Sequence, residues 1–170
     1  MKNLGQIIFF VVFLLSGTFA FAQTGGSVAS ATAATTVIIV HPLKIENRND
    51  LHFGEIASPL SEAIAVVSPA GAESGTVTWA DKSLITAASF DVTGEANHTV
   101  YITLPSVYTV TNGADAITIY NFVSNHPAGV FMLNADGMGR IDVGATLRAS
   151  ANQDVGTYTN PNGLEVSISY

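Results

Sequence analysis

The side chains that most often bind metals or move protons are scattered along this sequence. The four histidines stand far apart, at His41, His52, His98 and His126, and the chain has no cysteine. Zinc ligands usually include closely spaced pairs that converge on the metal. We therefore expect the histidines to occupy ordinary surface or loop positions, and the sequence predicts neither a metal site nor a cofactor.

The segment Asn134–Gly137, with Asp142 beyond it, carries the oxygen-bearing side chains that calcium prefers. A calcium-binding loop also needs acidic or amide residues at alternate positions and a closing glutamate, and both are missing here. An Asp-Gly pair is explained more simply by a turn. We expect a turn at this place.

Hydrolytic catalysis needs a nucleophile beside a base, or two carboxylates at a fixed separation. No serine lies in a Gly-x-Ser-x-Gly motif. The carboxylates of Asp91, Glu95, Asp115 and Asp142 belong to different segments. The sequence therefore predicts a protein that is not an enzyme, and its formal net charge of −7 argues against a nucleic-acid partner.

Trp79 is the only tryptophan of the chain. An exposed ring there would be a candidate for stacking on a glycan. Aromatic residues in alternating strands more often pack in the core, with the indole N–H hydrogen-bonded. The sequence alone leaves both interpretations of Trp79 open.

The elements that would position these residues follow a secretory signal. Lys2 precedes an apolar run, residues 7–15, and small residues at Ala20 and Ala22 predict signal-peptide cleavage after residue 22. The run is short for a bilayer span, which needs about 20 residues, and no later stretch is longer. We expect a secreted chain without a transmembrane segment, in the periplasm, on the cell surface or outside the cell.

Residues 23–36 are small and hydroxylated, and they predict a linker or an extended segment that waits for a partner. The β-branched run Val37–Val40 follows, before Pro42. Two interpretations of this run stay open. It is the first strand of the domain itself, which we favour, or it is a strand given to a neighbour.

From residue 37 to residue 170 the pattern is that of one all-β domain. Short apolar alternations recur between Gly, Pro and Asn residues, and no segment has a helical stripe. Asn112-Gly113 predicts a tight hairpin. We expect an immunoglobulin-like antiparallel β-sandwich. Its expected strands are 51–56, 64–67, 76–79, 88–92, 100–104, 108–110, 116–122, 139–147 and 164–170.

Seven short motifs in order resemble a bacterial exported domain-of-unknown-function family, number four-four-zero-two. The likeness covers residues 36–170, and Ala145 stands where that family usually has a second glycine. The motifs are residues 50–56, 90–94, 101–105, 111–113, 143–147, 156–158 and 166–170.

The C-terminal half is also similar to fimbrial subunits and spore-coat-type proteins, which end with a Gly-x-Tyr stretch and a last strand closing near a tyrosine. The residues that carry this likeness, and form a candidate C-terminal edge strand, are Gly156, Tyr158, Leu164, Val166, Ile168 and Tyr170. Such subunits lack one strand, which a neighbour's N-terminal extension supplies. The resemblance therefore implies assembly by strand donation, although many fimbrial subunits hold a disulfide that this chain lacks.

An extended peptide adds to an open sheet edge by main-chain hydrogen bonds, while alternate side chains fill pockets. The candidate assembly segment has its apolar residues at Val28, Ala31, Ala33, Val37 and Ile39. We expect a structural or surface protein, in the manner of a filament subunit, whose partner is itself or another surface protein. The alternative is a stand-alone surface module that binds a glycan or a protein.

Overall fold

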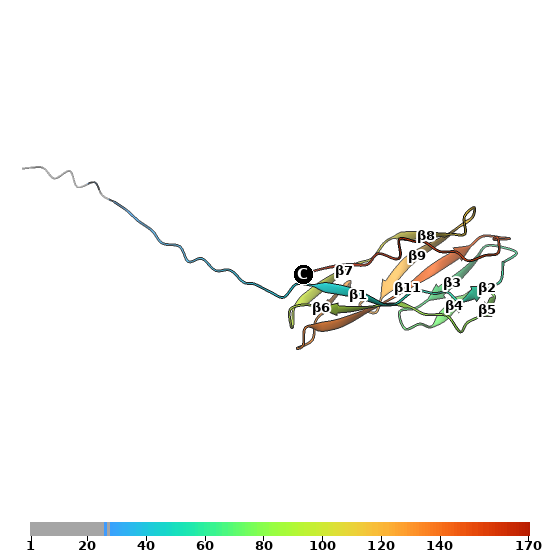
Figure 1. Cartoon of the computed structure of the whole chain (residues 1–170), viewed down its shortest axis with the longest axis horizontal. Coiled ribbons are helices and arrows are strands. Elements are labelled where there is room, and N and C mark those ends of the chain that lie inside the picture. The colour runs from blue at the N-terminus through green and yellow to red at the C-terminus, as the bar shows by residue number, and fades with distance from the viewer. Residues whose placement is uncertain (1–25, 27) are drawn as a thin grey trace, which may run out of the picture. The chain divides into compact units, whose positions relative to one another are not determined.

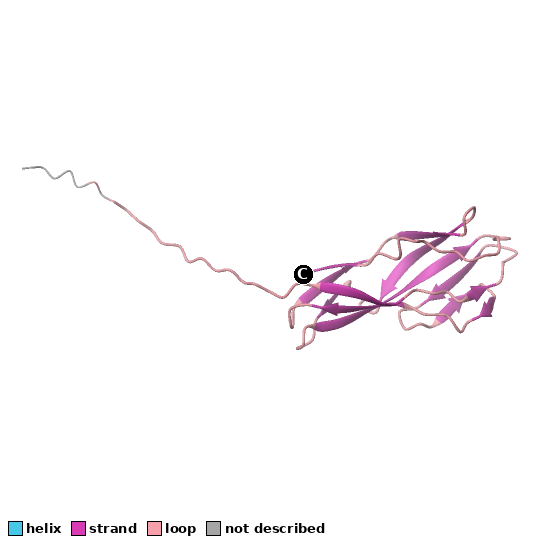
Figure 2. Ribbon diagram, viewed as in Figure 1, coloured by secondary structure: helices cyan, strands magenta, loops and turns pink. Residues whose placement is uncertain are grey.

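The structure, a computed structural model, describes residue 26 and residues 28–170. The predicted signal peptide, residues 1–22, lies outside the described residues. Over the described part the chain consists of strands, turns and loops without a helix (Figure 2). Accordingly, none of these residues belongs to a helix that could cross a membrane. The predicted all-β class is confirmed.

The strands are short and follow one another closely along the chain. They are β1 (Lys44–Asn49), β2 (Glu55–Ile56), β3 (Ala63–Val67), β4 (Glu73–Gly75), β5 (Trp79–Asp81), β6 (Ala88–Thr93), β7 (Thr99–Thr103), β8 (Val107–Thr111), β9 (Ala116–Ser124), β10 (Val130–Met132), β11 (Met138–Ala149) and β12 (Ser167–Ser169). Most expected strands are present, several in shorter form. The expected strand 76–79 is replaced by β4 and β5, which flank it.

One prediction about the start of the domain is wrong. The favoured interpretation made Val37–Val40 the first strand of the domain, but these residues lie in no strand, and pairing begins at Lys44 in β1. The side chains of Val37, Ile38 and Ile39 are more than four-fifths exposed, at 81%, 82% and 90%. The β-branched composition favours a strand, but the run pairs with no strand of the described chain.

The long strand β11 organises the largest sheet, and all its pairings are antiparallel. Its first half pairs with β6, and its second half lies between β3 and β9. At the edges of this sheet, β1 pairs with β6, β4 pairs with β3, and β8 pairs with β9, as Figure 1 shows. Smaller sheets are formed by β10, β7 and β12, and by β2 and β5. The hairpin predicted at Asn112-Gly113 joins β8 to β9.

The alternation of apolar residues places two hydrophobic clusters along the domain. The first cluster has Ala65 and Val67 of β3, Ile119 of β9 and Leu147 of β11 near its centre. The second has Val92, Val100, Leu133, Ile141 and Val143. Because β11 contributes to both clusters, it joins them into one continuous interior, and residues 38–170 form one unit.

Candidate functional site

The end of the chain runs antiparallel to both β7 and β8. Ser167 of β12 faces Thr103 of β7, and a separate bridge joins Thr159 to Thr111 of β8. Thr111 lies eight residues after Thr103, and Thr159 lies eight residues before Ser167. The two pairs therefore belong to the same antiparallel register. The predicted C-terminal edge strand is therefore present as a paired segment, of which only Ser167–Ser169 is regular strand. Along it Val166 is buried, and Leu164 and Ile168 are partly buried.

Two segments of the domain border an unpaired space that we call the seam. One border is residues 41–59, which pair on their other side with β6, with Thr86 and with β5. The opposite border is the C-terminal segment, residues 152–170. Figure 1 shows the two borders in cyan to green and in dark red. No strand pairing joins them anywhere in the described chain, so each presents a free backbone edge to the seam.

Hydrogen bonds close the seam only at its two ends, as far as the described residues go. At one end Ser58 Oγ donates to the carbonyl oxygen of Gln153 at 2.7 Å, and the Asn152 N–H donates to the carbonyl of Pro59 at 2.7 Å. At the other end the Tyr170 hydroxyl donates to the carbonyl of His41 at 2.8 Å. The two borders are thus linked at both ends of the seam and not between them in the described chain.

The half of the seam beside Ser58 opens into a groove of about 580 Å³ between residues 51–59 and residues 153–158. Its floor is apolar and consists of first-cluster residues from β8, β9 and β11, namely Val110, Ile117, Ile119, Leu147 and Ala149. Two apolar side chains on the wall of the groove, Leu84 and Val155, are 52% and 87% exposed. The groove lies directly over the core, whose residues Ile117, Ile119 and Leu147 are each at most 8% exposed.

In the other half of the seam, apolar side chains from both borders are only partly buried against the second cluster. They are Leu43 and Ile45 from one border, and Leu164 and Ile168 from the other. The arrangement offers two unpaired backbone edges above an apolar surface, which is the geometry that receives an added strand. The sequence did not single out the floor residues, because alternation predicts a strand but not which of its edges stays unpaired.

A group that we call the latch, His41, Glu95 and Tyr170, holds the end of the seam near β1. The Glu95 carboxylate accepts from the His41 N–H at 2.8 Å, and its Oε2 lies 2.7 Å from His41 Nδ1. These two contacts, the backbone one first, lower the pKa of Glu95 from its ordinary value of 4.5. The Tyr170 hydroxyl accepts from the Glu95 N–H at 2.7 Å while it donates to His41.

Gly94 makes room for the latch. A Cβ atom at this position would collide with the Tyr170 hydroxyl and would lie 2.9 Å from Leu43 Cδ1 and 3.1 Å from Leu133 Cδ1. The ring of His98 meets the ring of Tyr170 edge to face, with centroids 5.8 Å apart. Tyr170 is thus seated by several contacts, although 41% of it stays exposed.

Comparison with known proteins places this domain in a family. A model of the family described as Domain of unknown function (DUF4402) matches residues 43–170. The chain belongs to this family. No curated protein and no solved structure matches it significantly, so the similarity to fimbrial subunits gains no support from these comparisons.

The remaining residues with possible chemistry are dispersed over this DUF4402 domain. Within the described residues, no three His, Cys, Asp or Glu side chains gather as a cluster that could hold a metal ion. The turn predicted at Asn134–Gly137 is confirmed, because Asn134 Oδ1 accepts from the backbone N–H of Asp136 and of Met138. His52 Nδ1 lies 2.9 Å from the Gly54 N–H, which donates to it.

Trp79 of the DUF4402 domain is partly buried against the first cluster. Its indole N–H donates to the Phe53 carbonyl at 3.0 Å, and Lys82 Nζ lies 5.0 Å from its ring centroid. Both contacts are of the kind that fixes a structural tryptophan. Glycan stacking by Trp79 stays a prediction.

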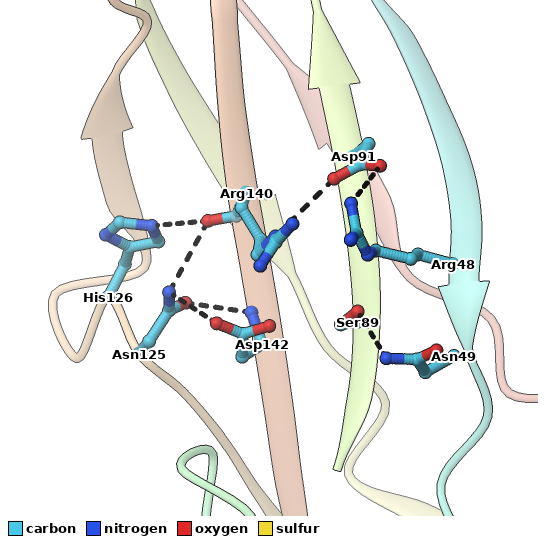
Figure 3. A network of polar contacts seen from close by, with 8 residues as sticks. All are labelled: Arg48, Asn49, Ser89, Asp91, Asn125, His126, Arg140 and Asp142. Atoms are coloured by element: carbon cyan, nitrogen blue, oxygen red, sulfur yellow. Dashed lines mark hydrogen bonds and ion pairs between the residues drawn. The ribbon is translucent and has the colours of Figure 1, made fainter.

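A polar network covers part of the β1–β6–β11 surface (Figure 3). Asp91 of β6 lies between Arg48 of β1 and Arg140 of β11, at 3.4 Å and 3.5 Å. Beyond the end of β9, Asn125 continues the ladder along β11: its N–H donates to the Asp142 carbonyl, and its Oδ1 accepts from the Asp142 N–H. His126 Nε2 lies 2.9 Å from the carbonyl of Arg140.

Proposed function

We propose that this protein is an exported structural or surface protein, not an enzyme, that assembles by strand donation. The arm, which we define as residues 28–40, leaves one copy and fills the seam of another. The proposal depends on two features that occur in the same chain: an apolar segment without a partner strand and two sheet edges without a partner strand. The apolar run Val37–Ile39 is exposed, and a seam elsewhere in the chain has free backbone edges above an apolar floor.

The first support is the energy available from burial. Burying one Val or Ile side chain is worth about 1.5–3 kcal/mol. Four consecutive β-branched residues, Val37–Val40, exposed to water are therefore a large unused source of binding energy. An extended strand would bury alternate members of this run and leave the others outside.

The second support is the sheet geometry. The unpaired N–H and C=O groups of an edge strand can pair with another strand, and native domains usually block such edges. The seam borders, residues 41–59 and 152–170, run antiparallel to each other, and each is longer than the arm. An arm in the seam would pair with both edges and close the groove above Ile117, Ile119 and Leu147.

Export is proposed on the sequence of residues 1–22, whose charged start, apolar run and small residues fit a cleaved signal. The partner under this proposal is a second copy of the chain. If electron microscopy of the exported protein finds only dispersed particles, the stand-alone binding module becomes the better interpretation.

The proposal is tested by changing one face of the arm at a time. We expect the exported double variant V37N/I39N to lose polymers by more than about a hundredfold, because each asparagine removes apolar burial and places an unpaired amide in a dry pocket. The matched variant I38N/V40N changes the outward face and should still polymerise. Polymers are measured by sedimentation and negative-stain microscopy.

Thermal unfolding of both variants serves as the control for folding, and both should melt as the original chain does before assembly. Equal loss of polymers from the two faces would point to nonspecific adhesion of an apolar run. Unchanged polymers in V37N/I39N would remove the arm from the mechanism.

A further inference from the structure

We propose that the latch commits the arm to a second copy, by preventing the arm from folding back into the seam of its own domain. This inference rests on the proposed strand donation and names Tyr170 as the residue that decides which seam is filled. Its basis is the hydrogen bonding of His41, the residue at which the arm joins the domain.

The arm could fill its own seam only by turning back beside β1. The chain enters β1 at Lys44, at the latch end of the seam, so a returning arm would form an antiparallel hairpin with this strand. The tightest such hairpin has Pro42 and Leu43 as its loop and pairs His41 with Lys44. That pairing would use the backbone N–H and the carbonyl oxygen of His41.

Both of these His41 groups are already engaged within the domain. The N–H donates to the Glu95 carboxylate at 2.8 Å, and the carbonyl oxygen accepts from the Tyr170 hydroxyl at 2.8 Å. A hairpin at this position would have to break both hydrogen bonds. The hydroxyl of Tyr170 would then lose its acceptor, and the Glu95 carboxylate would lose a donor.

Pro42 opposes the same turn for an independent reason. Two-residue hairpin loops favour types I′ and II′, both of which need a positive φ at the first loop residue. The proline ring fixes φ near −65°, which leaves only loops of types I and II, whose twist splays the two strands and makes the hairpin less favourable. The latch and Pro42 together favour an arm that stays available to another molecule, whose seam has free edges at the same positions.

The test removes the latch without removing the arm or the seam. In Tyr170→Phe the ring stays and the hydroxyl is lost. In Gly94→Ala the hydroxyl stays and is displaced, because the new Cβ collides with it. The matched control is Tyr101→Phe, since Tyr101 lies in β7, is 54% exposed, and has a hydroxyl without a hydrogen bond among the described residues.

The exported full chain and its three variants are each separated into polymer and monomer by sedimentation, and hydrogen exchange is measured at the amides of Val37–Val40 in both fractions. For the original chain and for Tyr101→Phe, we expect protected arm amides in the polymer and unprotected ones in the monomer. For Tyr170→Phe and Gly94→Ala, we expect the ratio of monomer to polymer to rise about tenfold, with protected arm amides in the monomer. Tenfold corresponds to about 1.4 kcal/mol, the order of one or two lost hydrogen bonds.

A ratio in Tyr170→Phe equal to that of Tyr101→Phe would overturn the inference. So would extra monomers whose arm amides exchange freely, because the arm would then be open and not folded back. Unprotected arm amides in polymers of the original chain would be a different result: they would overturn strand donation itself, and the role of the latch with it.

Discussion

Two exposed backbone edges of this domain are treated in opposite ways. Along β11, where β9 ends, Asn125 and His126 occupy the free edge with backbone and side-chain hydrogen bonds to residues 140–142. Along the seam, no hydrogen bond joins residues 41–59 to residues 152–170 between the two ends within the described chain. One edge is closed by polar side chains, and the other is left open above apolar ones.

The comparison shows that the open seam is not a sign of a generally loose sheet. The same chain satisfies a short free edge with an asparagine and a histidine, which is one of the ways in which native sheets avoid unwanted pairing. It also places Arg48, Asp91 and Arg140 as ion-pair partners on the surface of β1, β6 and β11 (Figure 3). Under the proposed strand donation, the unpaired seam is the place that the arm of a second copy fills.

The largest expected difference between the closed and the open parts of the domain is in the core beneath them. Ile141→Ala, at a fully enclosed position of the second cluster, should lower the free energy of unfolding by about 3–5 kcal/mol, because the cavity cannot relax. Ile119→Ala, on the floor of the groove, should cost about 2 kcal/mol, because that cavity merges with the open groove. Denaturant unfolding of the unassembled chain measures both.

Assembly should then remove this difference. When the seam is filled, the cavity left by Ile119→Ala would no longer open into the groove, and its cost should approach that of Ile141→Ala. Equal costs in the unassembled chain would contradict the view that the floor of the groove is open.

A smaller effect is expected at the closed edge. Asn125→Ala removes the side-chain bonds to the Asp142 N–H and to the Arg140 carbonyl, and should lower the free energy of unfolding by about 1 kcal/mol. Asn162→Ala is a matched control, because Asn162 is exposed and only its backbone N–H makes a hydrogen bond among the described contacts. Hydrogen exchange at Asp142 should speed up in Asn125→Ala, and an unchanged rate would show that the edge needs no cover.

The smallest effect is expected for the surface ion pairs. Asp91→Asn removes the charge that faces Arg48 and Arg140, and should change the free energy of unfolding by less than about 1 kcal/mol, because exposed pairs are weak. The difference between Asp91→Asn and the original chain should shrink further in high salt. A loss of several kcal/mol would mean that the polar surface is itself a binding or folding centre.

Much of the fold could be predicted from local pattern. The alternation of Ile141, Val143, Ala145 and Leu147 predicted a strand with one buried face, and all four are buried. The hairpin at Asn112-Gly113 and the turn at Asn134–Gly137 followed from residues that favour those backbone conformations. Ala145, in place of a second glycine, is buried and accommodated in β11.

The candidate site could be predicted only in part. Composition singled out the run Val37–Val40, whose role in assembly stays a prediction, and the closing alternation identified the C-terminal edge, Val166 and Ile168 included. The groove floor was missed, and so was the contact of Tyr170 with His41, which are 129 positions apart in the chain. Nothing in the sequence marked Gly94 either, because the need for a glycine there arises only from its contact with Tyr170, which is distant in the chain.

The sequence by itself determined the class of this protein: strands set by alternation, turns set by Gly, Pro and Asn, and an apolar run, Val37–Val40, before the domain. The tertiary structure alone decided that this run has no partner strand among the described residues, that residues 41–59 and 152–170 border an unfilled seam, and that Tyr170 holds His41. The physical reason is the range of the interactions. Side-chain periodicity is a property of neighbouring residues, whereas strand pairing and edge exposure depend on which distant segments meet and in which register.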